Sequence, residues 1–456
     1  MTSQALLSNY LSDLETKYQV SLDDVQIKAL ESLLEFILGS DRSICLSGKA
    51  GCGKTLLLSM LSDILTSKNY IIWNVAPTNK SKINFEHRCK KECMTLHSLL
   101  GLRPNLDILD FDASQLSFEF AVNTNWNVDV LLVDECSMIN DQLYSTLLDK
   151  AEQFEFKIIF SGDEKQLAPV KQSYISRTFS DNKVVTLEKV YRQKDSVLYK
   201  VLDYLRTKPL YKFKSIEDEN GSILVYNNIQ KMLKTHGGLF RVSQNFKDSS
   251  LVKLITYTNN RISALNQYIR NLIFQDNKEY HYGEILTGYD NCTNNNNSIF
   301  NSEDYMVESC VEGVILDCKG WYLTLIDLNQ NRLKVRILSR DNDSSDFDRI
   351  ARISESLRIK ALKSKKKQDW KKYYEFNDSF LTPVDLYYDG RIIRRKSLDY
   401  GYCISAHKSQ SSTYQIVLID MENIYRCTNV EELRQMQYVA LSRTAGEIII
   451  YDKNGN

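Results

Sequence analysis

The fold of this chain is decided by Gly48-Lys49-Ala50-Gly51-Cys52-Gly53-Lys54-Thr55. This stretch matches the pattern G-x-x-x-x-G-K-[ST] at every fixed position. Residues 43–46 before it are typical of a short buried strand, and the leucines of residues 54–68 recur at helical spacing. Glycines let backbone N–H groups surround a phosphate, and the N-terminus of the following helix adds partial positive charge. The order strand, glycine loop, helix therefore predicts a nucleoside triphosphate site and argues against a chance glycine-rich turn.

The pattern also assigns roles within the loop. Lys54 is expected to reach the β- and γ-phosphates, and the Thr55 hydroxyl is expected to bind Mg²⁺. ATP and Mg²⁺ are thus the expected cofactors. The remaining residues expected to surround the phosphates are Gly48, Ala50, Gly51, Cys52 and Gly53.

The amino-acid composition limits which classes of protein this chain can belong to. A chain of 456 residues with 11% aromatic residues can bury several hydrophobic cores. Lys plus Arg and Asp plus Glu both number 58, so nucleic acid would have to bind in a local groove and not on a basic coat. The N-terminus lacks a secretory pattern, and no apolar run approaches the roughly 20 residues of a membrane span. Ten scattered cysteines favour reduced thiols and a cytoplasmic location.

Apolar β-rich runs alternate with helical patterns along the first 200 residues. Runs at 70–76, 128–133 and 156–160 are apolar without alternation, which is typical of parallel strands covered on both faces. Helices are expected from residue 79 and over 141–153. We expect a first α/β domain over residues 1–200, with its chemistry at the carboxyl ends of the strands.

The same alternation of apolar β-rich runs with helical patterns returns in residues 201–456, and it predicts a second α/β domain. Strands are expected at 251–257, 402–404, 415–419 and 447–451, and helices at 260–274 and 430–442. An insertion over about 283–395 interrupts this domain.

The insertion has its own composition. Residues 290–297 form an expected Asn-rich loop, residues 311–337 contain three short expected strands, and residues 344–374 are a charged helical stretch. We expect a small barrel with a helical projection. Lysines between 360 and 372 allow two interpretations. They form a solvated helix face, or they belong to a projection that braces the inserted barrel or contacts displaced DNA.

Two adjacent carboxylates, Asp134 and Glu135, follow the expected strand at 128–133. In a triphosphate site the first of such a pair holds Mg²⁺ through water, and the second activates the attacking water. Their position after the glycine loop predicts hydrolysis as well as binding. A zinc site formed by His87, Cys89, Cys93 and His97 is a weaker alternative, because the spacings fit poorly with a C-x-x-C knuckle.

Motifs follow one another in a set order, at residues 24–29, 48–55, 76–80, 95–99, 134–137, 162–170, 187–193, 406–410 and 438–444. Taken in this order, they make the chain resemble the superfamily 1 helicases of the 5′-to-3′ group, in particular the Dda-like and RecD-like enzymes. The resemblance implies two RecA-like parallel-sheet P-loop domains. It also implies that Gln26 recognises adenine, that Gln166 senses the γ-phosphate, and that Arg192 and Arg443 reach the phosphates as catalytic arginines. The residues implied to contact nucleic acid are Pro77, Thr78, Asn79, Lys80, His97, Ser98, His407, Lys408 and Ser409.

The resemblance further implies a monomeric motor that acts on single-stranded DNA and duplex junctions, with a single-strand-binding protein or replisome components as further partners. A viral or phage origin, and hence a host cytoplasm, would suit the AT-rich character of the composition. Three alternatives stay open. They are an RNA-preferring or protein-displacing translocase, a small-molecule P-loop kinase, and a nucleotide-binding scaffold.

Two local features need separate mention. The family usually has glycine after His407-Lys408-Ser409-Gln410, whereas this chain has Ser411, so the loop geometry there should differ. The insertion at 102–125 corresponds to the β-hairpin pin of the resembling enzymes, and its sequence alternates polar with apolar residues. Phe111, near the expected tip, either stacks on the first base pair or packs the hairpin onto its own domain.

Overall fold

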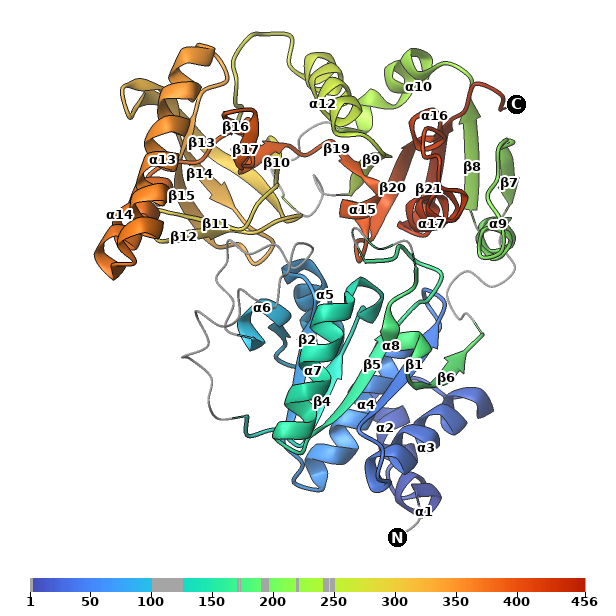
Figure 1. Ribbon diagram of the computed structural model, residues 1–456. Coiled ribbons are helices and arrows are strands. Elements are labelled where there is room, and N and C mark those ends of the chain that lie inside the picture. Colours follow the sequence, from blue (N-terminus) through green and yellow to red (C-terminus); the bar gives the residue numbers. More distant parts are fainter. Residues whose placement is uncertain are drawn as a thin grey trace.

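The computed structural model describes residues 3–100, 126–169, 172, 174–189, 197–218, 221–240, 246 and 251–455. Figure 1 shows a lower unit that contains the N-terminus, an upper unit that contains the C-terminus, and an inserted unit beside the upper one. The expected pin at 102–125, with Phe111, and the expected catalytic Arg192 lie outside the described residues.

The lower unit is built on a six-stranded parallel sheet in the order β3-β2-β4-β5-β1-β6. The expected strands are present, and all four residues of β4 are buried, as continuous apolarity predicts. The strands are β1 (Ser43–Gly48), β2 (Ile72–Ala76), β3 (Met94–Thr95), β4 (Val130–Val133), β5 (Lys157–Gly162) and β6 (Lys183–Leu187). The helices are α1 (Ser3–Ser8), α2 (Leu11–Tyr18), α3 (Asp24–Leu38), α4 (Lys54–Ser67), α5 (Asn79–Cys89), α6 (Leu96–Leu99), α7 (Asp141–Gln153) and α8 (Arg177–Ser180).

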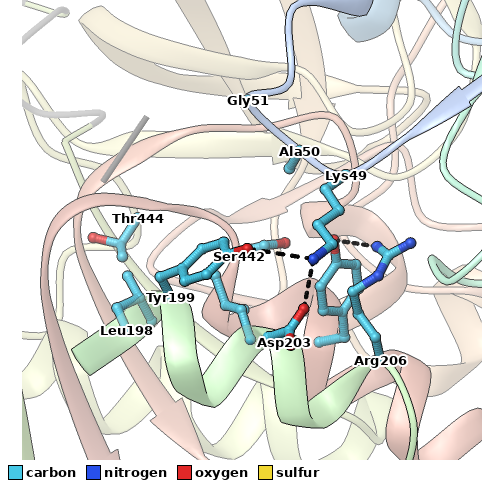
Figure 2. A pocket seen from close by; sticks show the side chains of 11 residues that line it. Lys49, Ala50, Gly51, Leu198, Tyr199, Asp203, Arg206, Ser442 and Thr444 are labelled. Carbon is cyan, nitrogen blue, oxygen red and sulfur yellow. Dashed lines mark hydrogen bonds and ion pairs between the residues drawn. The ribbon is translucent and has the colours of Figure 1, made fainter. Parts of the chain in front are cut away.

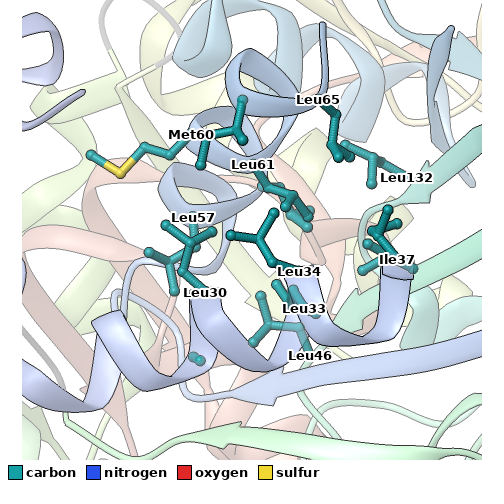
Figure 3. Packing of buried hydrophobic residues seen from close by; sticks show 14 of the residues in the cluster. Leu30, Leu33, Leu34, Ile37, Leu46, Leu57, Met60, Leu61, Leu65 and Leu132 are labelled. Carbon is teal, nitrogen blue, oxygen red and sulfur yellow. The ribbon is translucent and has the colours of Figure 1, made fainter. Parts of the chain in front are cut away.

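Helices α3 and α4 form the core beneath the glycine loop. Leucines at helical spacing on α3 interdigitate with those of α4, and both helices pack against β1 and β4 (Figure 3). A capping box between Asp23 and Gln26 fixes the start of α3. The core thereby holds the loop between β1 and α4 in a set position relative to α3. The labelled residues of this core are Leu30, Leu33, Leu34, Ile37, Leu46, Leu57, Met60, Leu61, Leu65 and Leu132.

The upper unit contains a second six-stranded sheet in the order β19-β9-β20-β21-β8-β7, in which only the β7–β8 pair is antiparallel among the described strands. Helix α9 (Val197–Leu205) packs with this sheet although it begins before residue 200. The strands are β7 (Ile216–Asp218), β8 (Gly221–Tyr226), β9 (Val252–Thr256), β19 (Cys403–Ser405), β20 (Tyr414–Asp420) and β21 (Thr444–Tyr451). The other helices of this unit are α10 (Ile229–His236), α12 (Asn259–Ile273), α15 (Ala406–Ser409), α16 (Met421–Ile424) and α17 (Val430–Leu441), with a short 3-10 turn at Gly237–Phe240. A second 3-10 turn, Cys136–Met138, follows β4 in the lower unit.

The inserted unit is a five-stranded antiparallel sheet in the order β15-β14-β13-β10-β18, with helices α13 and α14 beside it (Figure 1). Its central strands are longer than the three short ones expected. The sheet strands are β10 (Ile285–Gly288), β13 (Asp304–Ile315), β14 (Cys318–Ile326), β15 (Arg332–Leu338) and β18 (Leu398–Tyr400). The helices are α13 (Ser344–Ser364) and α14 (Lys367–Asp378), and a small hairpin joins β16 (Leu386–Tyr388) to β17 (Arg391–Arg394).

The expectation of a loop at 290–297 is wrong. Strands β11 (Cys292–Asn294) and β12 (Asn297–Ile299) pair as a hairpin there. Asn295 and Asn296 form its two-residue turn with φ of 49° and 62°, a left-handed conformation that asparagine tolerates and that such turns require. The single helical stretch expected at 344–374 is divided into two helices at Lys365, which also has a positive φ.

No helix within the described part of the chain combines the length and apolar character that crossing a bilayer requires.

Candidate active site and nucleic-acid interface

The glycine loop lies at the carboxyl end of β1, and its backbone is shaped as an anion cradle. Gly51 and Gly53 have φ of 81° and 93°, values that favour glycine. A Cβ on Gly53 would lie 2.8 Å from Gln26 Nε2, so the loop could not accept a larger residue there. No side chain caps the start of α4, which leaves its first N–H groups to face a ligand.

Lys54 and Gln26 are both held against the loop. Lys54 Nζ donates to the carbonyl oxygens of Gly48 at 2.6 Å and Lys49 at 3.0 Å. Burial opposes its charge, but Cys52 and the neighbouring carboxylates outweigh burial and raise the pKa of Lys54. Gln26 is buried, and its Nε2 donates to the Cys52 carbonyl oxygen at 3.5 Å. The role of Gln26 in recognising adenine stays a prediction.

Oxygen atoms suited to a hard cation meet beside Thr55. Thr55 Oγ1 lies 3.4 Å from Asp134 Oδ2, and Asp134 Oδ1 accepts from Ser161 Oγ at 3.1 Å and from the Glu135 N–H at 3.0 Å. This hydroxyl–carboxylate pair fits Mg²⁺, which prefers oxygen ligands and keeps several waters.

Glu135 is placed to accept a proton. Its φ of 53° puts a non-glycine residue in the left-handed region, a strain that is common at functional sites. Burial and the Asp134 carboxylate raise the pKa of Glu135, while Lys54 and Arg443 oppose the rise. A carboxylate whose pKa moves toward neutrality is a better general base for water.

The alternative of a zinc site gains no support. Over the part of the chain that the structure describes, no cluster of three or more His, Cys, Asp or Glu side chains could hold a metal. Burial raises the pKa of Cys89 to about 11 and that of Cys93 further, so both thiols stay protonated near neutral pH.

Arg443 brings a charge from the upper unit to the acidic residues of the lower one. It follows α17 and is only 4% exposed. Its guanidinium donates to the carbonyl oxygens of Val439 at 3.1 Å and Ser412 at 3.4 Å and to Ser442 Oγ at 2.8 Å. Arg443 and Glu135 each shift the pKa of the other, although burial is the main influence on both. The two charges thus interact across the junction, and the role of Arg443 as a catalytic arginine stays a prediction.

A pocket of about 60 Å³ lies between the glycine loop and the upper unit. Figure 2 shows Lys49 directed toward α9, where its Nζ contacts Asp203 Oδ1 at 2.5 Å and Tyr199 OH at 3.4 Å. The pocket is lined by Lys49, Ala50, Gly51, Leu198, Tyr199, Leu202, Asp203, Arg206, Tyr438, Ser442 and Thr444.

A buried ion pair made by Arg206, the residue directly after α9, closes the same junction. Arg206 Nη1 donates to both oxygens of Asp163, at 2.9 and 3.1 Å, and to Tyr438 OH at 3.0 Å. The Tyr438 hydroxyl donates in turn to Asp163 Oδ2 at 2.7 Å. Asp163 is fully buried, so the lower unit depends on the upper one to satisfy its charge.

A groove of about 600 Å³ runs between the two main units and the inserted one. Five of the residues expected to contact nucleic acid line it, namely Pro77, Thr78, Asn79, His407 and Lys408. Its other lining residues are Thr95, Met138, Ala168, Pro169, Tyr257, Thr258, Asn259, Tyr289, Asn291, Asn301, Ser302, Asp385, Ile392, Arg395, Lys396, Ser405 and Gln410.

Cations and aromatic rings alternate along this groove. Lys408 Nζ lies 3.6 Å from the centroid of the Tyr289 ring and also donates to Asn301 Oδ1 at 2.9 Å. The His407 ring stacks on Tyr257 with 6.3 Å between centroids. Single-stranded nucleic acid is bound by this mixture, through phosphate neutralisation and base stacking.

Three expected contact residues do not line the groove. The Ser409 hydroxyl is buried and donates to the Ala406 carbonyl oxygen at 2.8 Å, within its own helix. Lys80 Nζ donates to Tyr414 OH at 3.3 Å. Ser98 is exposed on α6, outside the groove lining, and His97 belongs to the same helix. Their roles in DNA binding stay predictions.

One side chain belongs to both the groove and the hydrolysis site. Gln410 lines the groove, and its Nε2 donates to Ser137 Oγ at 3.3 Å and to Gln166 Oε1 at 3.4 Å. Ser137 follows the acidic pair, and Gln166 is the residue expected to sense the γ-phosphate. Gln410 therefore connects the groove, where a strand is expected to bind, with the residues expected to hydrolyse the nucleotide.

Comparison with known proteins agrees with this arrangement. A family model described as an AAA domain matches residues 21–224. The ATP-dependent DNA helicase Dda of Enterobacteria phage T4 is 26% identical over 272 residues, which cover 58% of this chain and 60% of Dda. An uncharacterised protein of Acanthamoeba polyphaga mimivirus is 24% identical over 484 residues, 91% of this chain and 96% of that protein. The Pif1 helicase from Candida albicans has a TM-score of 0.53 at 17% identity, over 94% of both chains.

The resemblance to superfamily 1 helicases of the 5′-to-3′ group is confirmed. The structural match extends the helicase fold, with its two RecA-like units, over nearly the whole chain. Within this helicase fold Ser411 departs from the usual glycine, and it nevertheless has a φ of 63°. Its carbonyl oxygen accepts from Asn84 Nδ2 and its hydroxyl from Ser81 Oγ at 3.2 Å. Serine thus adopts the conformation that glycine allows and makes contacts with α5 of the lower unit.

Sequence reasoning missed the residues in and directly after α9 that line the pocket beside the glycine loop. Asp163 and Tyr438 lie in motifs that the sequence revealed, but Tyr199, Asp203 and Arg206 lie in no recognised motif. Their only signal is a helix with polar residues on one face and Leu198 and Leu205 on the other, which does not identify the partner of that face.

Proposed function

We propose that the protein is an ATP-driven helicase that moves 5′ to 3′ along single-stranded DNA and separates duplexes during replication, recombination or repair. The observation that carries the proposal is Gln410, which lines the groove and donates to both Ser137 and Gln166 in the hydrolysis site. A small-molecule kinase would have no need for such a connection.

The chain's own residues supply the chemistry of hydrolysis. The cradle around Gly51 and Gly53 and the start of α4 bind the phosphates of ATP, and Lys54 places its charge on the terminal ones. Glu135, whose pKa is raised by burial and Asp134, accepts a proton from the attacking water. Arg443 stabilises the negative charge that develops in the transition state.

Mg²⁺ fits beside Thr55 and Asp134, whose oxygens are 3.4 Å apart. When bound, this ion would neutralise part of the phosphate charge. The protein's part is to orient those oxygens, and Ser161 and the Glu135 N–H fix the Asp134 carboxylate for that purpose.

Movement follows from the division of residues between units. Lys54 and Glu135 belong to the lower unit, whereas Arg443 and Arg206 belong to the upper one. Hydrolysis requires the two units to be joined, and release of products allows them to separate, which is a hinge motion. Because the groove also runs between the units, alternate gripping by each would move a strand through it.

The cellular setting is part of the same proposal. We place the protein in the cytoplasm, or in the host cytoplasm if it is viral, as a monomeric motor. Its substrates are single-stranded DNA and duplex junctions, and a single-strand-binding protein or other replisome components would act beside it.

The test is ATP hydrolysis measured without nucleic acid, with single-stranded DNA and with single-stranded RNA, followed by unwinding of duplexes that carry a 5′ or a 3′ tail. We expect DNA to stimulate hydrolysis strongly and the 5′-tailed duplex alone to be opened. Lys54→Ala is the control for contaminating ATPases.

Each other outcome would contradict part of the proposal. Hydrolysis that nucleic acid does not change would favour a small-molecule kinase. Stronger stimulation by RNA would refute the DNA preference, and opening of only the 3′-tailed duplex would refute the direction of movement. Stimulated hydrolysis without duplex opening would leave a translocase.

A further inference from the structure

A second surface adjoins the groove and is formed by the β16–β17 hairpin and one face of α13. We call it the hairpin–helix surface. The hairpin packs on α13 through buried contacts in which Leu386 and Ile350 take part. Asp389 and Gly390, both with positive φ, form its two-residue turn. The hairpin is therefore held in place by its buried contacts with α13.

One side of this hairpin belongs to the groove, because Ile392, Arg395 and Lys396 line the groove on that side. The other side belongs to a shallow hollow of about 560 Å³ on α13. Tyr388 from the hairpin lines this hollow, so the two depressions meet across a single β-hairpin. The residues of α13 in the hollow are Arg352, Ser356, Ile359, Lys360, Lys363 and Ser364.

The charge of the hollow is uniformly positive. Arg352, Lys360 and Lys363 line it, and no carboxylate does. Lys360 has only a distant partner, at 4.0 Å from Asp369, and its side chain is 63% exposed. Among the described residues, no carboxylate pairs with Arg352 or Lys363. Solvent-exposed cations that no carboxylate pairs with can bind the phosphate groups of a nucleic acid.

Exposed aromatic rings accompany these cations. Tyr387 and Tyr388 are 52% and 39% exposed, and Ile392 beside them is 49% exposed. Successive residues of a strand point to opposite faces, so Tyr387 and Tyr388 offer a flat ring on each face of β16, and bases can stack on such rings. The exposed Arg391 adds a further cation at the turn.

We propose that the hairpin–helix surface binds single-stranded DNA next to the segment held in the groove, so that one strand passes from the groove over the β16–β17 hairpin onto α13. This inference rests on the proposed DNA-translocating function. Charge complementarity, the two exposed tyrosine rings and continuity with the groove all favour a single strand. A duplex keeps its bases stacked inside and would leave the tyrosines unused.

The test compares oligothymidylates of two lengths. Oligomers of about eight nucleotides are long enough to fill a groove of this kind, and those of about 20 also reach the second surface. We expect a double variant with Tyr387→Ala and Tyr388→Ala to lose about tenfold in affinity for the long oligomer, measured by fluorescence anisotropy. Its affinity for the short oligomer should match that of the parent.

A second pair of variants tests the cations. In a double variant with Arg352→Gln and Lys363→Gln, the slope of log K against log salt for the long oligomer should fall by about 1.4, because each lost single-strand phosphate contact lowers it by about 0.7. The matched controls are Tyr322→Ala, an exposed tyrosine on β14, and Lys371→Gln on α14. Neither should change binding of either oligomer.

Four results would overturn the inference. Unchanged binding of the long oligomer by both double variants would show that the surface makes no DNA contact. Equal losses for both lengths would place the effect in the groove or in the fold. Loss of blunt-duplex binding with single-strand binding intact would assign the surface to a duplex. If the parent bound neither oligomer, the proposed function itself would fail.

Discussion

Replacing Arg206 by glutamine should uncouple the two units with little effect on either one alone. Arg206 Nη1 supplies two of the hydrogen bonds that satisfy the fully buried Asp163. After the change Asp163 keeps the Tyr438 hydroxyl and the N–H of Lys165. Breaking a buried pair costs about 3–5 kcal/mol, and the remaining donors favour the lower end. A loss of about 3 kcal/mol corresponds to a factor of about 160 in the equilibrium between joined and separated units.

The assay is steady-state ATP hydrolysis at saturating single-stranded DNA. We expect kcat of Arg206→Gln to fall by about 100-fold, because Glu135 and Arg443 act together only when the units are joined. Arg206→Lys keeps the charge without the planar guanidinium and should recover part of the rate. The control is Arg177→Gln in the lower unit, which breaks an exposed pair with Asp181 worth less than about 1 kcal/mol. A parental kcat in Arg206→Gln would refute this account of the junction.

Four further outcomes are expected. Glu135→Gln should bind ATP normally in fluorescent-nucleotide titrations yet hydrolyse almost none, since it changes only the proton acceptor. Arg443→Ala should lower kcat by roughly 10³ or more with a much smaller change in ATP affinity. Ser411→Gly should change the urea unfolding free energy by less than about 1 kcal/mol, because relief of its left-handed backbone offsets the lost bond to Ser81. Burial raises the pKa of Glu303 to about 7, so the folded protein holds a proton there that the unfolded chain releases near pH 4.5. The free energy of unfolding should therefore fall as pH rises from about 4.5 to 7, by up to about 3 kcal/mol relative to Glu303→Gln.

The central strands were predictable because burial on both faces requires a continuous run of apolar residues. The glycine loop was predictable from its sequence pattern. Strand β4 consists of four buried apolar residues, and β1 leads directly into a full P-loop pattern. Strand β6 (Lys183–Leu187) at the edge of the same sheet was not expected, since a strand of mostly exposed or half-buried residues requires no such run. The asparagine hairpin was missed because its turn requires left-handed residues, and a run of asparagines is equally typical of a loop.

The residues of the candidate site also fall into those that the sequence could predict and those that it could not. Residues expected to act on ATP through a local motif, such as Lys54 and Glu135, could be proposed from spacing alone. Arg206 could not, because its partner Asp163 is 43 positions away and meets it only after α9 has packed on the second sheet. The expectation for Ser409 failed to foresee that its hydroxyl would be used within its own helix.

The contact of Gln410 with Ser137 and Gln166 has a thermodynamic consequence. Equilibrium coupling between two sites is reciprocal, so if a bound strand strengthens ATP binding by some factor, ATP must strengthen strand binding by the same factor. The lifetime of the protein on DNA then depends on nucleotide concentration as well as on the groove. A small molecule that binds in the pocket beside Lys49 and Tyr199 and alters ATP binding would therefore change the lifetime of the protein on DNA without contacting the DNA.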